Sequence, residues 1–405
     1  MPKVSDRTRN LGTENAFVVL KEVQDQIYNG KDIISFCIGQ PDFDTPQHIK
    51  DYAIKAINDG KTGYTASEGM LTLRSAIAEM QSEIKGIDIS PDDVVVANGA
   101  KPFIGYSIMA ATEYGKGHEV IYPRPGYPIY QSQAIVHGTK AVALDILEDK
   151  DFAFDLTTLT NIVNKNTKLL IINTPQNPTG GILQKKELQE IADLAIKYDF
   201  FILADEIYSK IVYDKKFESI ASLSGMQEHT IIMDGLSKAY SMTGWRIGYA
   251  INPKLAKHLS KWVTNIESCA GHPNQHAALQ AIKGPQTESE KMIATFKTRR
   301  ELIVKLLNDI PGFKCKLPGG AFYAYPNVTE ACKKVCARNA EEFRRMLLED
   351  AGVAVLSDIH FGGKVEGEGE HIRLSYATSS DNIKKGLERM KEFVINNTKQ
   401  VCKWD

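Results

Sequence analysis

Seven short apolar runs alternate with longer segments of mixed polarity between about residues 93 and 251. The runs are DVVVAN, EVIYP, AVALDI, KLLIIN, FFILAD, TIIMDG and RIGYAI. Several are apolar at consecutive positions, which is typical of strands buried on both faces of a mostly parallel sheet. Between them lie helix-like segments, such as the one in which Leu188, Ile191 and Leu194 recur near helical spacing. This alternation predicts a doubly wound α/β domain.

The pattern changes after about residue 285. A long charged helix is predicted through KMIATFKTRRELIVKLLNDI, ended by Pro311 and Gly312. The segments beyond it are predicted to form a strand, a helix, a mobile surface loop and a strand, in the order GGAFYAYP, AEEFRRMLLEDAG, FGGKVEGEGEH and HIRLSYA. We therefore expect a smaller α+β unit at the C-terminus.

Charge and hydropathy exclude several classes of protein. The 405 residues carry 49 Lys and Arg against 50 Asp and Glu, a formal net charge of −1. This balance gives no electrostatic case for nucleic acid or a membrane as the main partner. No apolar stretch has the length of a transmembrane helix, and the polar N-terminus lacks the apolar core of a secretory signal. The six scattered cysteines predict no disulfide framework, and hence a reducing, cytoplasmic location.

Two segments that follow predicted strands have the composition of ligand-binding loops. Pro102 opens a predicted helix after Ala100 and Lys101, and the free amides of a helix N-terminus attract anions. The loop with Asn173 and Asn177, in NTPQNPTGG, falls where ligands bind in open α/β sheets, at the carboxyl end of a strand. An ordinary turn is the alternative for each segment.

Asp205 and Glu206 end a very apolar strand. Period-two alternation sends them to opposite faces, so only one can belong to a site with the apolar residues before it. A buried carboxylate there requires a cationic partner. Two solvated acids at a strand exit are the alternative, and Tyr208 nearby is by default a packing residue.

Ser237 and Lys238 follow another predicted strand, and Arg246 lies shortly beyond them. A buried lysine in apolar surroundings has a lowered pKa, and its neutral amine is then a nucleophile. The alternatives are a solvated loop lysine, or a set of three residues that binds a phosphate.

Taken together, the motifs resemble those of the class I/II aminotransferases of fold type I, closest to the aspartate-aminotransferase-like branch. They occur in that family's order over nearly the whole chain: GQPDFDTP, KTGYTASEG, NGAK, YPRPGYP, NTPQNPTG, ADEIY, SKAYSMTGWRIGY, PGGAFY and IRLSYA. The resemblance implies a large domain with a mostly parallel seven-stranded sheet, a smaller α+β domain, and pyridoxal 5'-phosphate as cofactor. No metal is implied.

The resemblance also implies roles for the residues that act on the cofactor ring. Lys238 matches the lysine that holds the cofactor as a Schiff base and later moves protons. Asp205 matches the acid that pairs with the pyridine nitrogen. Tyr208 and Asn177 match the partners of the phenolic oxygen, and Tyr127 matches the aromatic residue that stacks on the ring.

Further residues match the positions that bind phosphate and substrate. The phosphate-binding positions are Ala100, Lys101, Ser237 and Arg246. Tyr64 matches a tyrosine that reaches the phosphate from a neighbouring subunit, which implies a homodimer with shared sites. Gly39 and Asn177 match substrate-binding positions, and Arg373 matches the arginine that takes the α-carboxylate.

The implied activity moves an amino group from an L-amino acid to a 2-oxo acid, such as 2-oxoglutarate, by a ping-pong mechanism. Lys101 favours aspartate or glutamate, because in some relatives the matching lysine faces the distal carboxylate of the substrate. Aromatic or alanine-type aminotransferases and carbon–sulfur lyases stay open as alternatives. A transcription regulator of this fold requires an added DNA-binding unit, and about forty residues before GQPDFDTP are too few for one.

The domains are expected to be an arm (1–15), a small domain (16–45 with 285–405) and a large cofactor-binding domain (46–284), because Gly39 and Arg373 must meet at one substrate.

Arg124 has no assigned role beyond that of a solvated or interface residue. His272 and His276 have the spacing of a metal pair on a helix, but no third ligand is near in the sequence.

Overall fold

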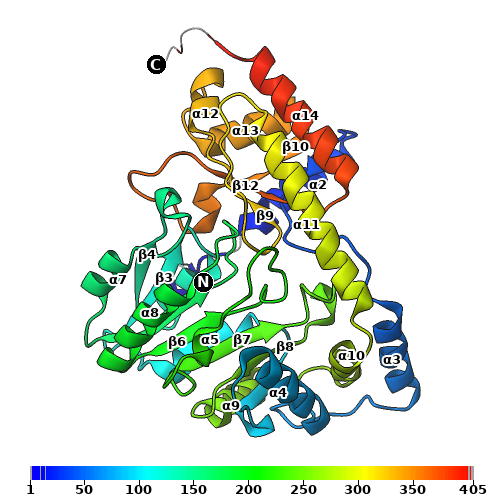
Figure 1. The fold of residues 1–405 in the computed structure, drawn as a ribbon, viewed down its shortest axis with the longest axis vertical. Coiled ribbons are helices and arrows are strands. Elements are labelled where there is room, and N and C mark those ends of the chain that lie inside the picture. The colour runs from blue at the N-terminus through cyan, green and yellow to red at the C-terminus, as the bar shows by residue number, and fades with distance from the viewer. Residues whose placement is uncertain (1, 10, 14, 400–401, 403–405) are drawn as a thin grey trace.

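The computed structural model describes residues 2–9, 11–13, 15–399 and 402 (Figure 1). Its largest element is a seven-stranded sheet in which β8 alone runs antiparallel to its neighbours. In their order across the sheet, the strands are β2 (Val94–Ala97), β8 (Gly248–Ile251), β7 (Thr230–Gly235), β6 (Phe201–Asp205), β5 (Thr167–Asn173), β3 (Glu119–Arg124) and β4 (Lys140–Asp145). All seven predicted apolar runs are strands, and the predicted fold class is confirmed.

Helices cover both faces of this sheet, which explains why its strands are apolar at consecutive positions. Val95 and Ala97 of β2 pack with one set of helices: α5 (Pro102–Ala111), α6 (Ile129–Val136) and α9 (Ala256–Ile266). Val94 and Val96 face the other side, which is covered by α3 (Gln47–Asn58), α4 (Leu71–Lys85), α7 (Leu156–Ile162), α8 (Lys185–Tyr198) and α10 (His272–Lys283). Pro102 is the first residue of α5, as its position after a strand predicts.

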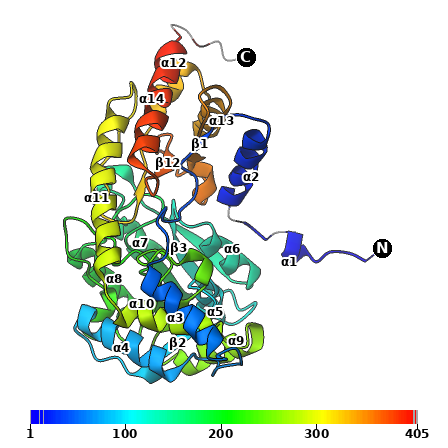
Figure 2. The same ribbon diagram turned by 90° about the vertical axis from the view of Figure 1, so that its right-hand side faces the viewer.

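The C-terminal third forms its own core, and the N-terminal segment joins it (Figures 1 and 2). Its elements are α11 (Thr287–Asn308), β9 (Tyr323–Ala324), α12 (Thr329–Val335), α13 (Ala340–Asp350), β10 (Val353–Ala354), β11 (Leu356–Ser357), β12 (Ile372–Ser375) and α14 (Ser380–Asn396). Strands β11, β12 and β9 make a small antiparallel sheet. From the other end of the chain, β1 (Ile34–Ser35) pairs in parallel with β10, and α2 (Asn15–Tyr28) lies beside α13.

Several short elements complete the fold. They are α1 (Asp6–Arg9) and the 3-10 turns η1 (Pro91–Asp93), η2 (Glu148–Lys150), η3 (Ile220–Ser222), η4 (Thr243–Trp245) and η5 (Asp358–Phe361). None of the helices in the described part of the chain has the length and apolar character needed to cross a membrane.

Two features of the C-terminal third differ from what the sequence predicts. The segment predicted to be a surface loop, after Phe361, buries Val365 and Glu370. Cys336 and Cys402 form a disulfide with a Cα–Cα distance of 5.3 Å, a pairing that the spacing of the cysteines does not predict. The tail beyond α14 makes this pairing possible because it returns to α12, where the Lys399 amide donates to the Lys334 carbonyl at 2.9 Å.

The most deeply buried ion pair lies on the α4 side of the sheet. Lys85 of α4 contacts Glu206 at 2.5 Å, and each side chain is 1% exposed. Ser219 donates a hydrogen bond to the second carboxylate oxygen at 2.5 Å. Asp205 therefore faces one side of the strand end and Glu206 the other, as period-two alternation predicts, and Glu206 is paired rather than solvated.

The ion pair predicts a large stability effect. In Lys85→Met the Glu206 carboxylate stays buried without its cation, so we expect the free energy of unfolding in urea to fall by about 3–5 kcal/mol. The matched control is Lys55→Met, whose partner Asp59 is exposed, and we expect it to change stability by less than about 1 kcal/mol. Equal stability of the two variants would contradict the assignment.

Candidate active site

One cavity of about 520 Å³ lies at the carboxyl ends of β5, β6 and β7, where the large sheet meets the C-terminal third. Every candidate site residue predicted from the sequence lines it except Tyr64. Those that line it are Gly39, Ala100, Lys101, Tyr127, Asn177, Asp205, Tyr208, Ser237, Lys238, Arg246 and Arg373. They come from separate segments of the chain, and the fold brings them together.

Lys238 follows β7 and presents its amine to the cavity. Its Nζ donates a hydrogen bond to the Gly39 carbonyl at 2.6 Å and lies 5.9 Å from the centre of the Tyr208 ring. Gly39 must be a glycine, because an added Cβ would lie 2.1 Å from the Tyr323 hydroxyl. The backbone of Gly39 thus comes close to both the amine and Tyr323.

Asp205, the last residue of β6, is buried at the floor of the cavity with 6% exposure. Its Oδ2 accepts a hydrogen bond from the Tyr130 hydroxyl at 2.5 Å, and its Oδ1 accepts one from the Ile207 amide at 3.3 Å. Burial raises the pKa of Asp205 to about 6, although the Tyr130 hydrogen bond opposes this shift. A cation brought close to this carboxylate would be strongly stabilised.

Arg373 of β12 is buried, with an exposed fraction of 3%. One Nη donates to Asn177 Oδ1 at 3.0 Å and the other to the Cys37 carbonyl, so both acceptors are neutral. Its Nε has no hydrogen-bond partner among the described residues. A buried guanidinium with neutral partners attracts an anion, and a carboxylate matches its planar donors.

A second cationic region lies at the N-terminus of α5, beside Arg246. The Arg246 Nη2 donates to the Asn98 carbonyl at 3.3 Å, and its backbone is left-handed with φ of 57°. An added Cβ at Gly99 would lie 2.1 Å from that Nη2, and one at Gly248 would lie 2.1 Å from the Ala100 amide. The two glycines therefore allow a close approach of backbone and guanidinium, which suits binding of an anion.

Four tyrosines line the cavity: Tyr127, Tyr130, Tyr208 and Tyr323. The Tyr208 and Tyr323 hydroxyls are 2.7 Å apart, and burial raises the pKa of Tyr208 well above its ordinary value. Tyr208 therefore stays protonated and can donate a hydrogen bond. Tyr127 packs edge-on against Tyr130 with ring centres 5.6 Å apart, and the Lys101 Nζ lies 5.5 Å from the Tyr127 ring.

Sequence reasoning missed Tyr130 and Tyr323, although both stand in or beside motifs that it noted. Tyr130 lies on the first turn of α6, three residues after Tyr127, a spacing that brings both side chains to one site.

Tyr64 lies outside the cavity and is 89% exposed. Arg124 makes a bidentate ion pair with Asp145, its register partner on β4, at 2.6 and 2.8 Å.

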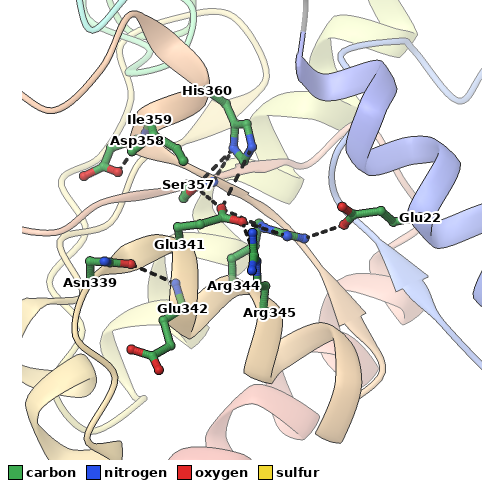
Figure 3. Close-up of polar contacts among 10 residues, drawn as sticks. All are labelled: Glu22, Asn339, Glu341, Glu342, Arg344, Arg345, Ser357, Asp358, Ile359 and His360. Carbon is green, nitrogen blue, oxygen red and sulfur yellow. Dashed lines mark hydrogen bonds and ion pairs between the residues drawn. The ribbon is translucent and has the colours of Figure 1, made fainter. Parts of the chain in front are cut away.

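A buried polar cluster supports the wall of the cavity that carries Arg373 (Figure 3). Glu341 and Arg344 of α13 form an ion pair, Ser357 donates to Glu341 at 2.6 Å, and Arg344 also contacts Glu22 of α2 at 3.2 Å. Ser357 belongs to β11, which pairs with the strand of Arg373. The cluster thereby ties α2, whose first residues line the cavity, to the small antiparallel sheet.

Comparisons of the sequence and of the fold with known proteins all find aminotransferases. The family model described as aminotransferase class I and II matches residues 31–390. An aspartate aminotransferase of Bacillus subtilis (strain 168) is 36% identical over 97% of this chain and 99% of that protein. An aromatic-amino-acid aminotransferase 2 of Thermococcus litoralis is 37% identical over 91% of this chain and 93% of that protein. The crystal structure of the aspartate aminotransferase from Rhizobium meliloti has a TM-score of 0.92 at 31% identity, covering 98% of this chain and 100% of that one.

The buried Asp205 predicts a pH-dependent stability of the cofactor-free chain. Its carboxyl group holds its proton more tightly in the folded state, with a pKa of about 6, than in the unfolded chain, where the ordinary value is 3.8. The protonated Asp205 therefore adds about 3 kcal/mol to the free energy of unfolding. This contribution is complete below pH 3.8 and is lost as the pH rises through 6. In Asp205→Asn the side chain does not titrate, so its free energy of unfolding should not show this decrease. We expect the difference in unfolding free energy between the two proteins to change in that window, and a constant difference would contradict the prediction.

Proposed function

The chain belongs to the class I and II aminotransferases, and on that premise we propose that it uses pyridoxal 5'-phosphate to transfer the amino group of aspartate or glutamate. The acceptor is a 2-oxo acid such as 2-oxoglutarate, and the two substrates react in turn at one site. The observation that carries the proposal is the convergence of an amine, a buried carboxylate and a buried guanidinium, those of Lys238, Asp205 and Arg373, in one cavity.

The residues present fit this cofactor. An amine can bind its aldehyde, a buried carboxylate can pair with its ring nitrogen, and the region of Gly99, Ala100 and Arg246 can take its phosphate. The close approaches at Gly99 and Gly248 support this assignment, since a side chain at either position would close the phosphate region. Ser237 and Lys101 supply further phosphate donors, and Tyr127 supplies a face for the ring.

Each residue has a separate duty in the proposed mechanism. When bound, the cofactor supplies the electron sink that makes loss of the Cα proton feasible. Asp205 keeps the ring nitrogen protonated, because a negative charge nearby favours the protonated form. The Lys238 Nζ would act as the base that takes the proton from Cα and then gives it to the cofactor's aldehyde carbon rather than back to Cα. Tyr208 and Asn177 donate hydrogen bonds at the ring, and Arg373 holds the α-carboxylate with both Nη atoms.

We propose that Lys101 selects a dicarboxylic substrate through its ammonium group. Its exposed position beside Tyr127, at the mouth of the cavity, supports this. The rival specificity is aromatic, and the name of the Thermococcus relative favours it. A carbon–sulfur lyase would use the same lysine, acid and arginine, but it would release a keto acid without an amino acceptor.

A homodimer with shared sites is also part of the proposal. The observation that supports it is the 89% exposure of Tyr64, an aromatic side chain that no site on its own chain uses. In a dimer its hydroxyl would reach the phosphate of the neighbouring subunit. A monomeric mass of the active enzyme in light scattering would contradict this arrangement.

We further propose that residues 16–45 with 285–405 move as a small domain against 46–284, closing over the substrate. The shared core of Ile34 and Phe36 with the C-terminal third supports this division. Identical substrate-free and substrate-bound structures would count against it. A cytoplasmic location is supported by the free thiols of Cys37, Cys269, Cys315 and Cys332, whereas the Cys336–Cys402 disulfide favours an oxidising compartment. A secreted protein in fractionated cells would contradict the cytoplasmic location.

The cofactor and its lysine are tested by absorbance. We expect the purified protein to have a visible band that shifts on adding aspartate, because substrate displaces Lys238 from the cofactor. Lys238→Ala should lose this band and at least about a thousandfold in kcat. Lys210→Ala, a nearby lysine outside the cavity, should keep both. A Lys238→Ala variant with the wild-type spectrum and activity would exclude the proposed role.

Substrate choice is tested with Lys101→Met. If Lys101 binds the distal carboxylate, kcat/KM for aspartate should fall roughly 10- to 100-fold, since a charge-assisted hydrogen bond is lost. The loss for alanine, which has no distal carboxylate, reports only the contribution of Lys101 at the cofactor phosphate, so the loss for aspartate should exceed it by at least about fivefold. An equal loss for both substrates would assign Lys101 to the cofactor phosphate alone.

A further inference from the structure

A second group of potential ligands lies apart from the active site. Glu148, at the start of η2, meets Glu368 and His371 of the segment before β12, and one ligand atom of each lies within 4.8 Å of the other two. Glu148 and His371 are 223 residues apart in sequence. A search for short ligand spacings therefore predicts no metal here.

His371 is held in the orientation and tautomer of a metal ligand. Its ring is 3% exposed and stacks on Tyr325, with ring centres 4.9 Å apart and an angle of 4° between the planes. Its Nδ1 is 3.0 Å from the Gly369 carbonyl, which can only accept, so Nδ1 carries a proton. In the neutral ring Nε2 then has a free lone pair, and it points at Glu148 Oε2 at 3.2 Å. Ligating histidines commonly donate their other nitrogen to a carbonyl in this way.

A buried carboxylate oxygen without a hydrogen-bond partner among the described residues faces the cavity beside Glu368 and His371. Asp358 is 5% exposed, and its Oδ2 has no hydrogen-bond partner among the described residues. Its Oδ1 accepts from the Ile359 amide at 2.8 Å, and Figure 3 shows the carboxylate pointing away from the cluster around Glu341. Asp358, Glu368 and His371 line one cavity of about 10 Å³, which is the room of a single water-sized group.

Few cations lie near these acids: the Lys316 Nζ bonds the Glu148 backbone carbonyl and the Asp151 carboxylate, and it contacts neither Glu368 nor Asp358 in any recorded hydrogen bond or ion pair of the described residues. Glu148 accepts from the Asn327 amide at 2.7 Å, and Glu368 accepts from the Glu148 amide at only 3.4 Å. Lys364, the cation in this segment, pairs with Glu370 instead. A protonated His371 would satisfy Glu148, but Glu368 and Asp358 would still face the cavity as acids.

We propose that Glu148, Glu368 and His371 bind one divalent transition-metal ion, and that Asp358 accepts a hydrogen bond from a water on that ion. One imidazole nitrogen with carboxylate oxygens suits Mn²⁺ or Zn²⁺ better than Ca²⁺, which prefers oxygen ligands alone. The ion joins η2, beyond the edge strand β4, to the segment that leads into β12. It is structural and independent of the proposed transamination.

The probe is Mn²⁺, titrated into full-length protein with its cofactor bound, after chelation and dialysis. Electron paramagnetic resonance of the free ion measures binding, and we expect one saturable site per chain. Glu368→Gln, a half-buried and conservative change, should weaken binding at least about tenfold. The matched control is Glu366→Gln, an exposed acid of the same segment, which should bind as wild type does. Saturating Mn²⁺ should raise the unfolding temperature of wild type and of the control.

Three outcomes would overturn the proposal. The first is that the wild type shows no saturable binding below about 1 mM Mn²⁺, where a three-ligand site should be filled. The second is that Glu368→Gln binds Mn²⁺ with unchanged affinity. The third is that Glu366→Gln loses as much affinity for Mn²⁺ as Glu368→Gln does. Wild-type binding needs no variant, so misfolding of a mutant cannot hide the first outcome. His371→Gln gives a second variant, and its visible cofactor band reports that it is folded.

Discussion

The alignment of strand ends in the large sheet is the constraint on which the site depends. Asn173 and Asp205 are register partners on β5 and β6, and Asp205 is the partner of Met233 on β7. Parallel pairing brings the carboxyl ends of these strands to one edge, so the residues that follow them project into one space. A shift of one residue in β6 would send Asp205 to the opposite face of the sheet and bring Ala204 or Glu206 to its place.

Two buried charges of opposite sign line the cavity, and among the described residues their recorded hydrogen-bond partners are neutral. Asp205 has a hydroxyl and an amide as neighbours, and Arg373 has two neutral oxygens. The surrounding protein stabilises each only partly, and this is costly for the isolated chain. A ligand with a cation at one end and a carboxylate at the other would satisfy both charges. The cavity is thus electrostatically complementary to what it is proposed to hold, and this complementarity favours binding over chain stability.

Sequence patterns predicted the large sheet because local rules decide it, whereas Gly39, Tyr127 and Arg373 were assigned to the site by the family resemblance. Consecutive apolar residues marked each buried strand, and alternation separated Asp205 from Glu206. The parts that were missed depend on contacts between distant segments. The pairing of Arg124 with Asp145 requires the register of β3 and β4, and the contact of Lys85 with Glu206 requires the packing of α4. Tyr130 was missed for another reason: a tyrosine in an apolar helix is ordinarily a packing residue. The exposure of Tyr64 agrees with an intersubunit role but does not test it.

The parallel pairing of β1 with β10 has a consequence for the order in which the protein forms. Ile34 leaves the ribosome more than three hundred residues before its partner Val353. At ordinary rates of synthesis that interval is on the order of tens of seconds. During this time the large sheet can fold, whereas the N-terminal segment, including apolar Ile34 and Phe36, has nothing to pack on. Ile34 and Phe36 therefore complete their packing only after the C-terminal third is made, and until then they are apolar surface that can aggregate or bind a chaperone.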